Sequence, residues 1–540
     1  MTVRRNAAAL CVGMVIASIS VTAFTLEPVP FQVSGRVYQD RDGDGRRDAG
    51  EPGVSGVVVS NGRALTRTGR DGGYRIDVRP GQTLFVVKPA GWRLVRDPAT
   101  LPRFWLHASP DPTPVLKYGG IPQVPTLRRF DLGLQRESPA RALDVRIFGD
   151  PQVKSIEDVG YYGRDIVDSV LAERARPDVG RPQLGLSLSD IADDVLSLYP
   201  ALNAQTVRMG IPWLHVAGNH DLDFDAVRDE DSLLSFRNAY GPDTFAWEEA
   251  QAVFIGLDDV IYRPGQRPAY IGGFRDDQFA FLEAYLPGVP KDRLLVLAMH
   301  IPLFEPDGRD TFRDADRERL FALLRDYPRV LILSAHSHTQ QHRMHDARSG
   351  WHGARPLHEY NVGAACGAFW SGVKDTAGIP DATMADGTPN GYASLRIAAD
   401  GDYALAWHPA RDTQDTRIGL HAPRVLRRGA YPAWSVYANV YMGREDTRVE
   451  YRIDQGEWTP MARVARADPR LSRENALDDA AGTLRGYDRS PEAEVSTHLW
   501  RGALATDLSI GAHRIEVRAF DPWLGESRAH TEYRLQEAVR

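Results

Sequence analysis

Short runs of alternating apolar and polar residues characterise the chain between residues 27 and 136. Alternation with a period of two is typical of strands with one buried face, and the Gly, Asp and Pro clusters between the runs favour turns. We therefore predict a small antiparallel β-sandwich for residues 27–136. The clearest runs are Val33–Val37, Val57–Val59, Tyr74–Val78 and Leu84–Val87.

Strand-like and helix-like runs alternate between residues 141 and 409. Continuous apolar runs are expected of strands buried on both faces, and apolar residues recurring every three or four positions are expected of helices. The alternation predicts an α/β domain. The predicted strands include Leu143–Phe148, Leu294–Met299 and Val330–Leu333, and the predicted helices are Tyr161–Arg176, Asp276–Leu286 and Asp310–Asp326.

Alternating runs return between residues 410 and 540 and predict a third, β-rich domain. Its strand candidates are Trp434–Tyr441, Val449–Ile453 and His513–Ala519. The stretch Ala465–Glu494 is polar and charged, and we expect it to be a long loop.

The N-terminus has the pattern of a secretory signal peptide. Two arginines precede an apolar run, Ala7–Ser20, and Val21 and Ala23 occupy positions −3 and −1 of a cleavage site. The alternative is a membrane anchor, which the short run with its Ser and Gly residues disfavours. We expect residues 1–23 to be removed, leaving a periplasmic or secreted protein whose mature chain has no membrane span.

The composition is that of an ordinary globular protein, with 43% apolar and 25% charged residues in a chain of 540. The net charge of −7 argues against a nucleic-acid partner, because binding to a phosphate backbone needs a concentrated basic surface. Only two cysteines are present, and Cys366 alone would remain after removal of the leader. The mature chain would therefore have no internal disulfide.

An acidic loop within the first domain fits the pattern D-x-D-x-D-G-x5-E. This spacing folds several carboxylates around one point, as a hard cation with six to eight oxygen ligands requires. The flanking runs are strand-like, which argues against an EF-hand, and the alternative is a solvated acidic turn. The candidate Ca²⁺ ligands are Asp40, Asp42, Asp44, Asp48 and Glu51. The stretch Ser34–Val59 also resembles the prealbumin-like B-type domains of bacterial adhesins, and this resemblance implies a structural Ca²⁺ site.

Five clusters of ligand-type residues occur in order along the α/β domain, most of them directly after an apolar run. Polar side chains at the carboxyl ends of buried strands converge on one crevice of an α/β sheet. Asp, Asn, Gln and His together suit Mn²⁺, Fe²⁺ or Zn²⁺, and one carboxylate can bridge two such ions. The clusters are Gly149-Asp150-Pro-Gln152, Ser189-Asp190-Ile-Ala-Asp193, Gly218-Asn219-His220-Asp221, His300, and Ala335-His336-Ser-His338.

The ordered set resembles the calcineurin-like metallophosphoesterases, whose pattern is D-x-H, G-D-x-x-D, G-N-H-[DE], a lone H, and G-H-x-H. The resemblance covers residues 141–408 and implies a β-sandwich flanked by helices that holds two divalent metals. By this resemblance Asp190 bridges both ions. Asp150, Gln152 and His338 complete the first metal site, and Asn219, His300 and His336 complete the second.

The same resemblance implies that His220 binds no metal and acts as a general acid on the leaving oxygen, with Asp221 orienting it. A metal-bound hydroxide would attack phosphorus in line. The chain departs from the pattern where Gln152 replaces His and where Ser189 and Ala335 replace Gly. A Cβ at these last two positions crowds the backbone turn.

A narrower resemblance is to an exported bacterial subgroup that has an N-terminal prealbumin-like domain and a C-terminal β-rich domain, and in which Gln152 is part of the pattern. Trp370, which closely follows the last metal motif, is expected to line the substrate pocket. The stretches that carry this resemblance include Ala364–Gly372, Gly378–Tyr392, Tyr437–Tyr441, Ser496–Trp500 and Gly511–Asp521.

The sequence therefore predicts an exported, dinuclear metal-dependent phosphohydrolase between two mainly-β modules. Its substrate would be a small-molecule or envelope phosphate ester, either a monoester or a diester. The alternative is a catalytically inert protein that binds an envelope glycan or protein through its β-modules. An inert copy would be expected to lose one or more metal ligands, and none is missing from the set Asp150, Asp190, Asn219, His300, His336 and His338.

Overall fold

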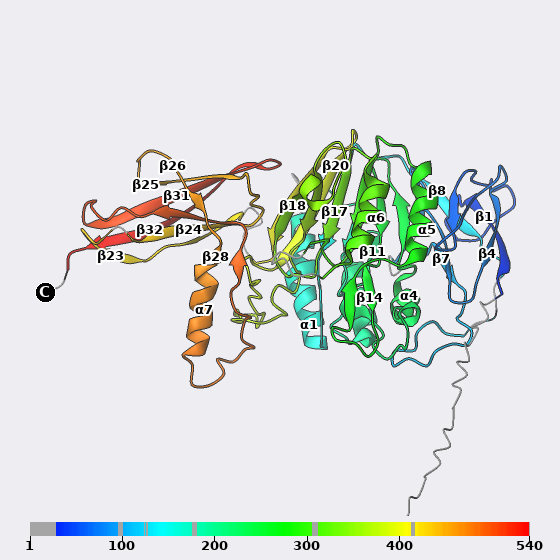
Figure 1. The fold of residues 1–540 in the computed structure, drawn as a ribbon, viewed down its shortest axis with the longest axis horizontal. Helices are drawn as coiled ribbons and strands as arrows, with labels where there is room; N and C mark the ends of the chain where they lie inside the picture. Colours follow the sequence, from blue (N-terminus) through cyan, green and yellow to red (C-terminus); the bar gives the residue numbers. More distant parts are fainter. Residues whose placement is uncertain are drawn as a thin grey trace, which may run out of the picture.

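The computed structural model of the chain describes residues 29–95, 101–123, 125, 128–174, 181–304, 311–411, 416–431 and 433–538. The predicted signal peptide, residues 1–23, lies outside the described residues. Three β-rich bodies lie in a row, with the α/β body between the two others (Figure 1). Among the described residues, no helix combines the length and the apolar content needed to cross a bilayer.

The N-terminal body is a sandwich of two four-stranded sheets, in the orders β4-β1-β8-β6 and β3-β2-β5-β7. Alternation is clearest in β4, where Tyr74, Ile76 and Val78 point into the core and the residues between them are exposed. The pairing is antiparallel except between β1 and β8. The strands are β1 (Phe31–Gln39), β2 (Val58–Ser60), β3 (Leu65–Arg67), β4 (Gly73–Val78), β5 (Thr83–Val86), β6 (Trp92–Leu94), β7 (Trp105–His107) and β8 (Leu132–Arg136).

The central body contains a five-stranded sheet, β11-β10-β9-β20-β21, and a six-stranded sheet, β12-β13-β16-β17-β19-β18. The continuous apolar runs form the middle strands, and every residue of β16 and β17 is buried. The strands are β9 (Ala142–Phe148), β10 (Leu184–Ser187), β11 (Trp213–His215), β12 (Phe245–Glu248), β13 (Ala252–Gly256), β16 (Leu294–Ala298), β17 (Val330–Ser334), β18 (Gln341–His345), β19 (Leu357–Asn361), β20 (Gly391–Ala398) and β21 (Tyr403–Pro409). A separate hairpin comprises β14 (Val260–Tyr262) and β15 (Tyr270–Gly272).

Helices flank this pair of sheets, as the α/β pattern predicts (Figure 1). The predicted helix Tyr161–Arg176 is divided into α1, a π-helical turn over Tyr162–Val167, and α2. The helices are α1 (Ile156–Tyr161), α2 (Asp168–Arg174), α3 (Tyr199–Thr206), α4 (Leu234–Tyr240), α5 (Asp276–Tyr285) and α6 (Asp314–Leu324). The fold class expected from the sequence, a central sandwich flanked by helices between two mainly-β modules, is confirmed.

The C-terminal body is a second sandwich, with sheets in the orders β22-β24-β30-β27 and β23-β32-β31-β25-β26. Its longest strands form the antiparallel hairpin of β31 and β32. The strands are β22 (Ile418–His421), β23 (Val425–Arg427), β24 (Ser435–Val440), β25 (Arg448–Ile453), β26 (Thr459–Pro460), β27 (Ala462–Arg463), β30 (Leu499–Ala503), β31 (Gly511–Asp521) and β32 (Gly525–Gln536). The short strands β28 (Arg466–Ala467) and β29 (Val495–Ser496) form a separate pair.

The prediction of one long loop over Ala465–Glu494 is wrong, because α7 occupies Pro469–Asp479. Asp468 caps this helix: its carboxylate accepts hydrogen bonds from the backbone N–H groups of Arg470 and Leu471. A proline follows at the first helical position, which is where proline favours a helix. Only Leu471 and Asn475 of the helix are buried, so the apolar periodicity was too weak to reveal it.

The N-terminal sandwich and the central body share one continuous hydrophobic core, whereas the C-terminal sandwich has a core of its own. Lys88 illustrates the first junction: it is 1% exposed, and its Nζ lies 2.6 Å from the Glu249 carboxylate of the central body. At the second junction Nε2 of His498 lies 3.0 Å from the carboxylate of Asp386, and both side chains are buried. The outer modules are therefore packed onto the central body through specific buried groups.

Candidate metal centre

The five predicted clusters converge because each follows the end of a strand. Asp150, Asp190 and the Asn219–Asp221 turn follow the parallel strands β9, β10 and β11 of one sheet. His300 and His336 follow the parallel strands β16 and β17 of the other sheet. The carboxyl ends of both sheets therefore supply the ligand-type residues to one region.

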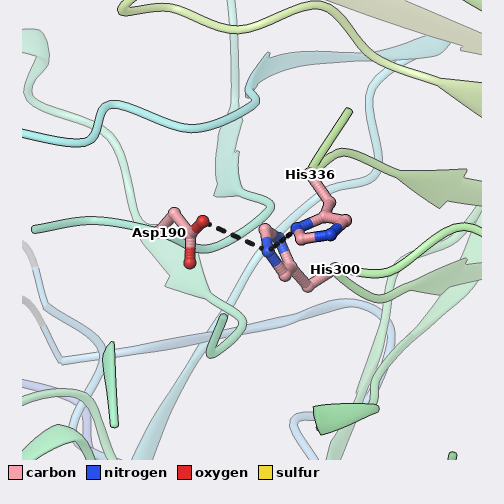
Figure 2. A group of neighbouring side chains, drawn as sticks. All are labelled: Asp190, His300 and His336. Carbon is pink, nitrogen blue, oxygen red and sulfur yellow. Dashed lines mark hydrogen bonds and ion pairs between the residues drawn. The ribbon is translucent and has the colours of Figure 1, made fainter. Parts of the chain in front are cut away.

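His300 lies at the centre of the second predicted metal site. Its Nε2 is 3.2 Å from the Asp190 carboxylate, 2.9 Å from the Asn219 side-chain oxygen and 3.0 Å from Nδ1 of His336. Figure 2 shows the side chains of Asp190, His300 and His336 pointing toward one another from three separate segments. One donor atom from each of these three residues lies within 4.8 Å of the other two. Four donors expected at the second metal therefore meet around one point.

The residues expected at the first metal lie next to this group. Asp150 is fully buried, and its carboxylate accepts a hydrogen bond from the backbone N–H of His336 at 3.2 Å. Nδ1 of His338 lies 2.7 Å from the carbonyl oxygen of Gly367, a contact that fixes the ring and leaves Nε2 as the ligand atom. The backbone N–H of Gln152 donates to the Asp190 carbonyl at 2.8 Å, which joins the first metal motif to the loop that carries Asp190.

Backbone strain is concentrated at these positions. A left-handed conformation is costly for residues other than glycine and is retained where the surrounding structure enforces it. Gly218 shows how closely the turns pack, since a Cβ at this position would collide with the Asp190 carboxylate. Six ligand-motif residues have left-handed φ angles: Asp150 (40°), Gln152 (38°), Ser189 (83°), Asp190 (41°), His336 (68°) and His338 (50°). The crowded turn expected where Ser189 replaces Gly is therefore present, whereas Ala335 is not among these left-handed residues.

Electrostatics in the site suit a bound cation. Burial lowers the pKa of His336 to about 3 and that of His338 to about 4, so both imidazoles are neutral at pH 7 and able to bind a metal. Burial also raises the pKa of Asp150 to about 8. A divalent ion beside this carboxylate would favour its charged form and reverse that shift. The donor set of carboxylates, amides and imidazoles therefore fits divalent transition metals.

His220 lies beside this group, with its ring directed at a pair of carboxylates. Its Nδ1 is 2.8 Å from the Asp194 carboxylate and 3.2 Å from that of Asp193. Burial opposes protonation of His220, but the hydrogen bond to Asp194 and the charge of Asp190 outweigh it and raise its pKa to about 9. Its backbone N–H donates to the Asp190 carboxylate at 2.9 Å. His220 therefore lies next to Asp190, with its ring held by two carboxylates.

The structure places Asp221 differently from the expectation that it orients His220. Its carboxylate is fully buried and accepts hydrogen bonds from the Tyr199 hydroxyl at 2.8 Å and from the backbone N–H groups of Gly218 and Ile191. Asp221 therefore joins the turn after β11 to the loop after β10. The side chain that orients the ring of His220 is Asp194.

Sequence reasoning did not assign a role to three further residues. Asp194 contacts His220, and the Asp259 carboxylate accepts a hydrogen bond from the His300 backbone N–H at 3.0 Å. The hydroxyl of Tyr118, which belongs to the N-terminal third of the chain, donates to the Asp194 carbonyl at 2.7 Å. Both aspartates are the second of an acidic pair in the sequence, and Asp258-Asp259 follows an apolar strand, so that pair could have been identified.

The acidic loop of the N-terminal sandwich follows β1 and lies outside this centre. One carboxylate oxygen from each of Asp40, Asp42 and Glu51 lies within 4.8 Å of the others, whereas Asp44 and Asp48 are not part of that group. The carboxylate of Asp40 accepts hydrogen bonds from the backbone N–H groups of Gly43 and Gly45. The expected Ca²⁺ site stays a prediction, because these bonds also account for the loop geometry.

Comparisons with known proteins give family matches over most of the chain. The family model described as calcineurin-like phosphoesterase matches residues 166–340. The models for the N-terminal and C-terminal parts of calcineurin-like phosphoesterases match residues 41–115 and 359–526. The C-terminal match begins within the central body, at β19.

Solved structures also match the chain. Purple acid phosphatase PPD1 from seeds of yellow lupin (Lupinus luteus) matches with a TM-score of 0.37 and 11% identity, over 72% of this chain and 68% of that one. A search of curated proteins finds no match. With its three family matches in chain order and its ligand motifs gathered in one place, the chain belongs to the calcineurin-like phosphoesterases and is a metal-dependent phosphate-ester hydrolase.

Proposed function

We propose that the protein is an exported phosphohydrolase that uses two divalent metals, shared by Asp190, to cleave small-molecule or envelope phosphate monoesters or diesters. The observation that carries this proposal is the meeting of donor atoms of buried Asp190, buried His300 and half-buried His336 within 4.8 Å of one another. Asp190 also lies beside the Asp150 loop, through the hydrogen bond from Gln152 to its carbonyl. This position between the two ligand groups supports a bridging role.

Each of the two ligand groups would hold one metal ion. Asp150, Gln152 and His338 would hold one ion, and Asn219, His300 and His336 the other. Bound divalent metals would neutralise phosphate charge and lower the pKa of a coordinated water. The left-handed backbones at several of these positions would hold the ligand side chains in place before the ester binds.

His220 is placed to supply the proton for the leaving oxygen. Its Nδ1 is held by Asp194 and Asp193, so Nε2 is the ring atom left to face the ester. The carboxylates of Asp194 and Asp193 at Nδ1 raise the pKa of His220 and so favour the protonated imidazole that a general acid requires. His220 would thus donate from Nε2 while the carboxylates at Nδ1 stabilise its charge.

The substitution Asp190→Asn tests the site. We expect it to lower hydrolysis of nitrophenyl phosphate monoesters and diesters at least about 100-fold and to reduce the bound metal, measured by elemental analysis, because it removes a shared ligand. The matched control is Asp326→Asn, which changes an exposed aspartate on the surface. Undiminished turnover and metal content in the Asp190 variant would refute the assignment.

Export rests on the leader pattern in residues 1–23. We expect the protein recovered from the periplasm or the medium to begin at Phe24 when its N-terminus is sequenced. Recovery of the protein from the cytoplasm with Met1 retained would contradict export. It would not affect the assignment of the catalytic site.

A further inference from the structure

Two consecutive aromatic residues beside the metal centre have left-handed backbones. Phe369 has a φ of 56° and Trp370 a φ of 53°, in the loop that follows β19. This conformation is a rare outlier for bulky residues, and two in succession persist only where the surroundings enforce them. The strain therefore indicates that the surrounding structure fixes the direction of each of these two rings.

The two rings point to different environments. Trp370 is 4% exposed, and its indole N–H donates to the carbonyl oxygen of Pro151 at 2.9 Å. Since Pro151 lies between Asp150 and Gln152, the indole fastens the loop to the first metal motif. The expectation that Trp370 lines the substrate pocket is therefore wrong, because its ring is part of the core.

Phe369 has the opposite placement. Its side chain is 44% exposed, and its ring centroid lies 4.5 Å from that of His338, at an interplanar angle of 31°. One face of the ring thus covers a metal-ligand imidazole, and the remainder is open to solvent. Burial accounts for the placement of Trp370, whereas the exposed ring of Phe369 is held against His338 by a strained backbone.

A second aromatic ring borders the other histidine of the same motif. The rings of Tyr270 and His336 meet edge to face at 6.2 Å. Tyr270 belongs to β15 and pairs across the hairpin with Tyr262 of β14. Both imidazoles of the His336-Ser-His338 motif are therefore lined by aromatic carbon, on segments far apart in the sequence.

We propose that Phe369 forms a subsite for the alcohol part of the phosphate ester and selects alcohols that carry a planar ring next to the phosphate. The proposal rests on the proposed function, because it uses the metal centre as the phosphate site. A phosphate held beside His338 brings the substituent on its ester oxygen alongside the exposed ring. Stacking on an aromatic face favours planar partners over alkyl groups of similar size.

Binding of phosphonates to the metal-loaded protein tests the subsite without turnover. We would measure, by calorimetry, the affinities of benzyl-, cyclohexylmethyl-, hexyl- and ethylphosphonate. We expect benzylphosphonate to bind roughly tenfold more tightly than ethylphosphonate, which corresponds to about 1.4 kcal/mol. Equal preference for the hexyl or cyclohexylmethyl compound would indicate a merely apolar site and would overturn the selection for planar rings.

Variants of Phe369 separate ring stacking from simple shielding of His338. In Phe369→Ala the preference for benzylphosphonate should fall to about twofold or less, whereas Trp434→Ala, at a 49% exposed aromatic residue of the C-terminal module, should leave it unchanged. Phe369→Leu keeps an apolar cover, so it should retain bound metal but lose the preference for the planar ring. A preference unchanged in both variants, or lost metal in both, would overturn the proposal.

The outcome for the subsite is distinguishable from that for the hydrolase. Selective binding of benzylphosphonate that depends on Phe369, in a protein that hydrolyses no phosphate ester, would contradict the proposed function and support the subsite. Hydrolysis of benzyl and ethyl phosphate with the same selectivity in the native protein and in Phe369→Ala would support the proposed function and contradict the subsite.

Discussion

Nδ1 of His220 lies 2.8 Å from the carboxylate of Asp194, a residue that is itself left-handed with a φ of 60°. The carbonyl of the same Asp194 accepts a hydrogen bond from the hydroxyl of Tyr118, at 2.7 Å. The proton donor proposed for the leaving group is thus positioned by an aspartate outside the ligand set. A residue near the N-terminal sandwich in turn supports that aspartate.

We predict that Asp194→Asn lowers kcat about tenfold with little change in bound metal, because the amide orients His220 less well and stabilises its charge less. The measurement is steady-state hydrolysis of a nitrophenyl phosphate ester, with elemental analysis of the same samples. His220→Ala should be at least as severe, and the double variant should be no worse than His220→Ala. Fully additive losses would show that the two side chains act independently.

Asp221→Asn should act mainly on stability. Its buried carboxylate accepts hydrogen bonds from Tyr199, Gly218 and Ile191. In asparagine one of the two oxygens is replaced by an NH₂ group, which donates and cannot accept, so at least one of these bonds is lost. We expect a loss of about 2–3 kcal/mol in the free energy of unfolding, seen as a lower Tm in thermal denaturation. An unchanged Tm together with lost activity would instead favour the direct catalytic role expected from the sequence.

Acid should weaken the junction between the N-terminal sandwich and the central body through His107. Its ring nitrogens lie 2.7 Å from the Thr83 hydroxyl and 2.8 Å from the Arg237 carbonyl. Burial lowers the pKa of His107 from 6.5 to about 4, against the hydrogen bond to the Arg237 carbonyl, which favours the charged ring. The charges of Arg237 and Arg103 add to the lowering, and that of Asp243 opposes it. The unfolded chain therefore binds the proton more readily, so stability present above pH 6.5 is lost progressively as the pH falls toward 4.

For His107 the loss amounts to about 2 kcal/mol between pH 8 and pH 5. We predict that His107→Gln, whose amide can serve both partners, shows a smaller fall in Tm over this range than the native protein. An equal fall in the two proteins would show that protonation of His107 does not contribute.

Ca²⁺ should raise the Tm of the full chain by a few degrees if the acidic loop binds it. The full chain is the appropriate sample because the N-terminal sandwich shares its hydrophobic core with the central body. The protein would first be chelated and reloaded with the transition metal, and Mg²⁺ would serve as the ionic control. Asp42→Asn should abolish the response, and Asp77→Asn, at an exposed aspartate on β4, should not. If Ca²⁺ does not raise the Tm of the native chain, the loop does not bind Ca²⁺, and its carboxylates serve only to accept hydrogen bonds from backbone N–H groups.

Local patterns along the chain were sufficient to predict the strands β9, β16 and β17, and to place ligand-type residues after them. Strands such as β16 and β17 are continuous apolar runs, and polar residues after parallel strands must meet at one edge of the sheets. Asp190, His300 and His336 could therefore be grouped before their distances were known. The weakly apolar helix α7 was missed, because its formation depends on the cap at Asp468 more than on periodicity.

Long-range packing decided the rest, because contacts between distant segments leave no periodic signal. Nothing in the order of residues indicates that Asp194, and not Asp221, orients His220, or that Tyr118 supports Asp194 from a segment 76 residues away. The different placements of Phe369, which is exposed, and Trp370, which is buried, also depend on backbone angles that only the assembled loop enforces. Residue types and their order thus predict the chemistry of the metal centre. The positions of His220, Phe369 and Trp370 arise from the packing of the modules and loops around it.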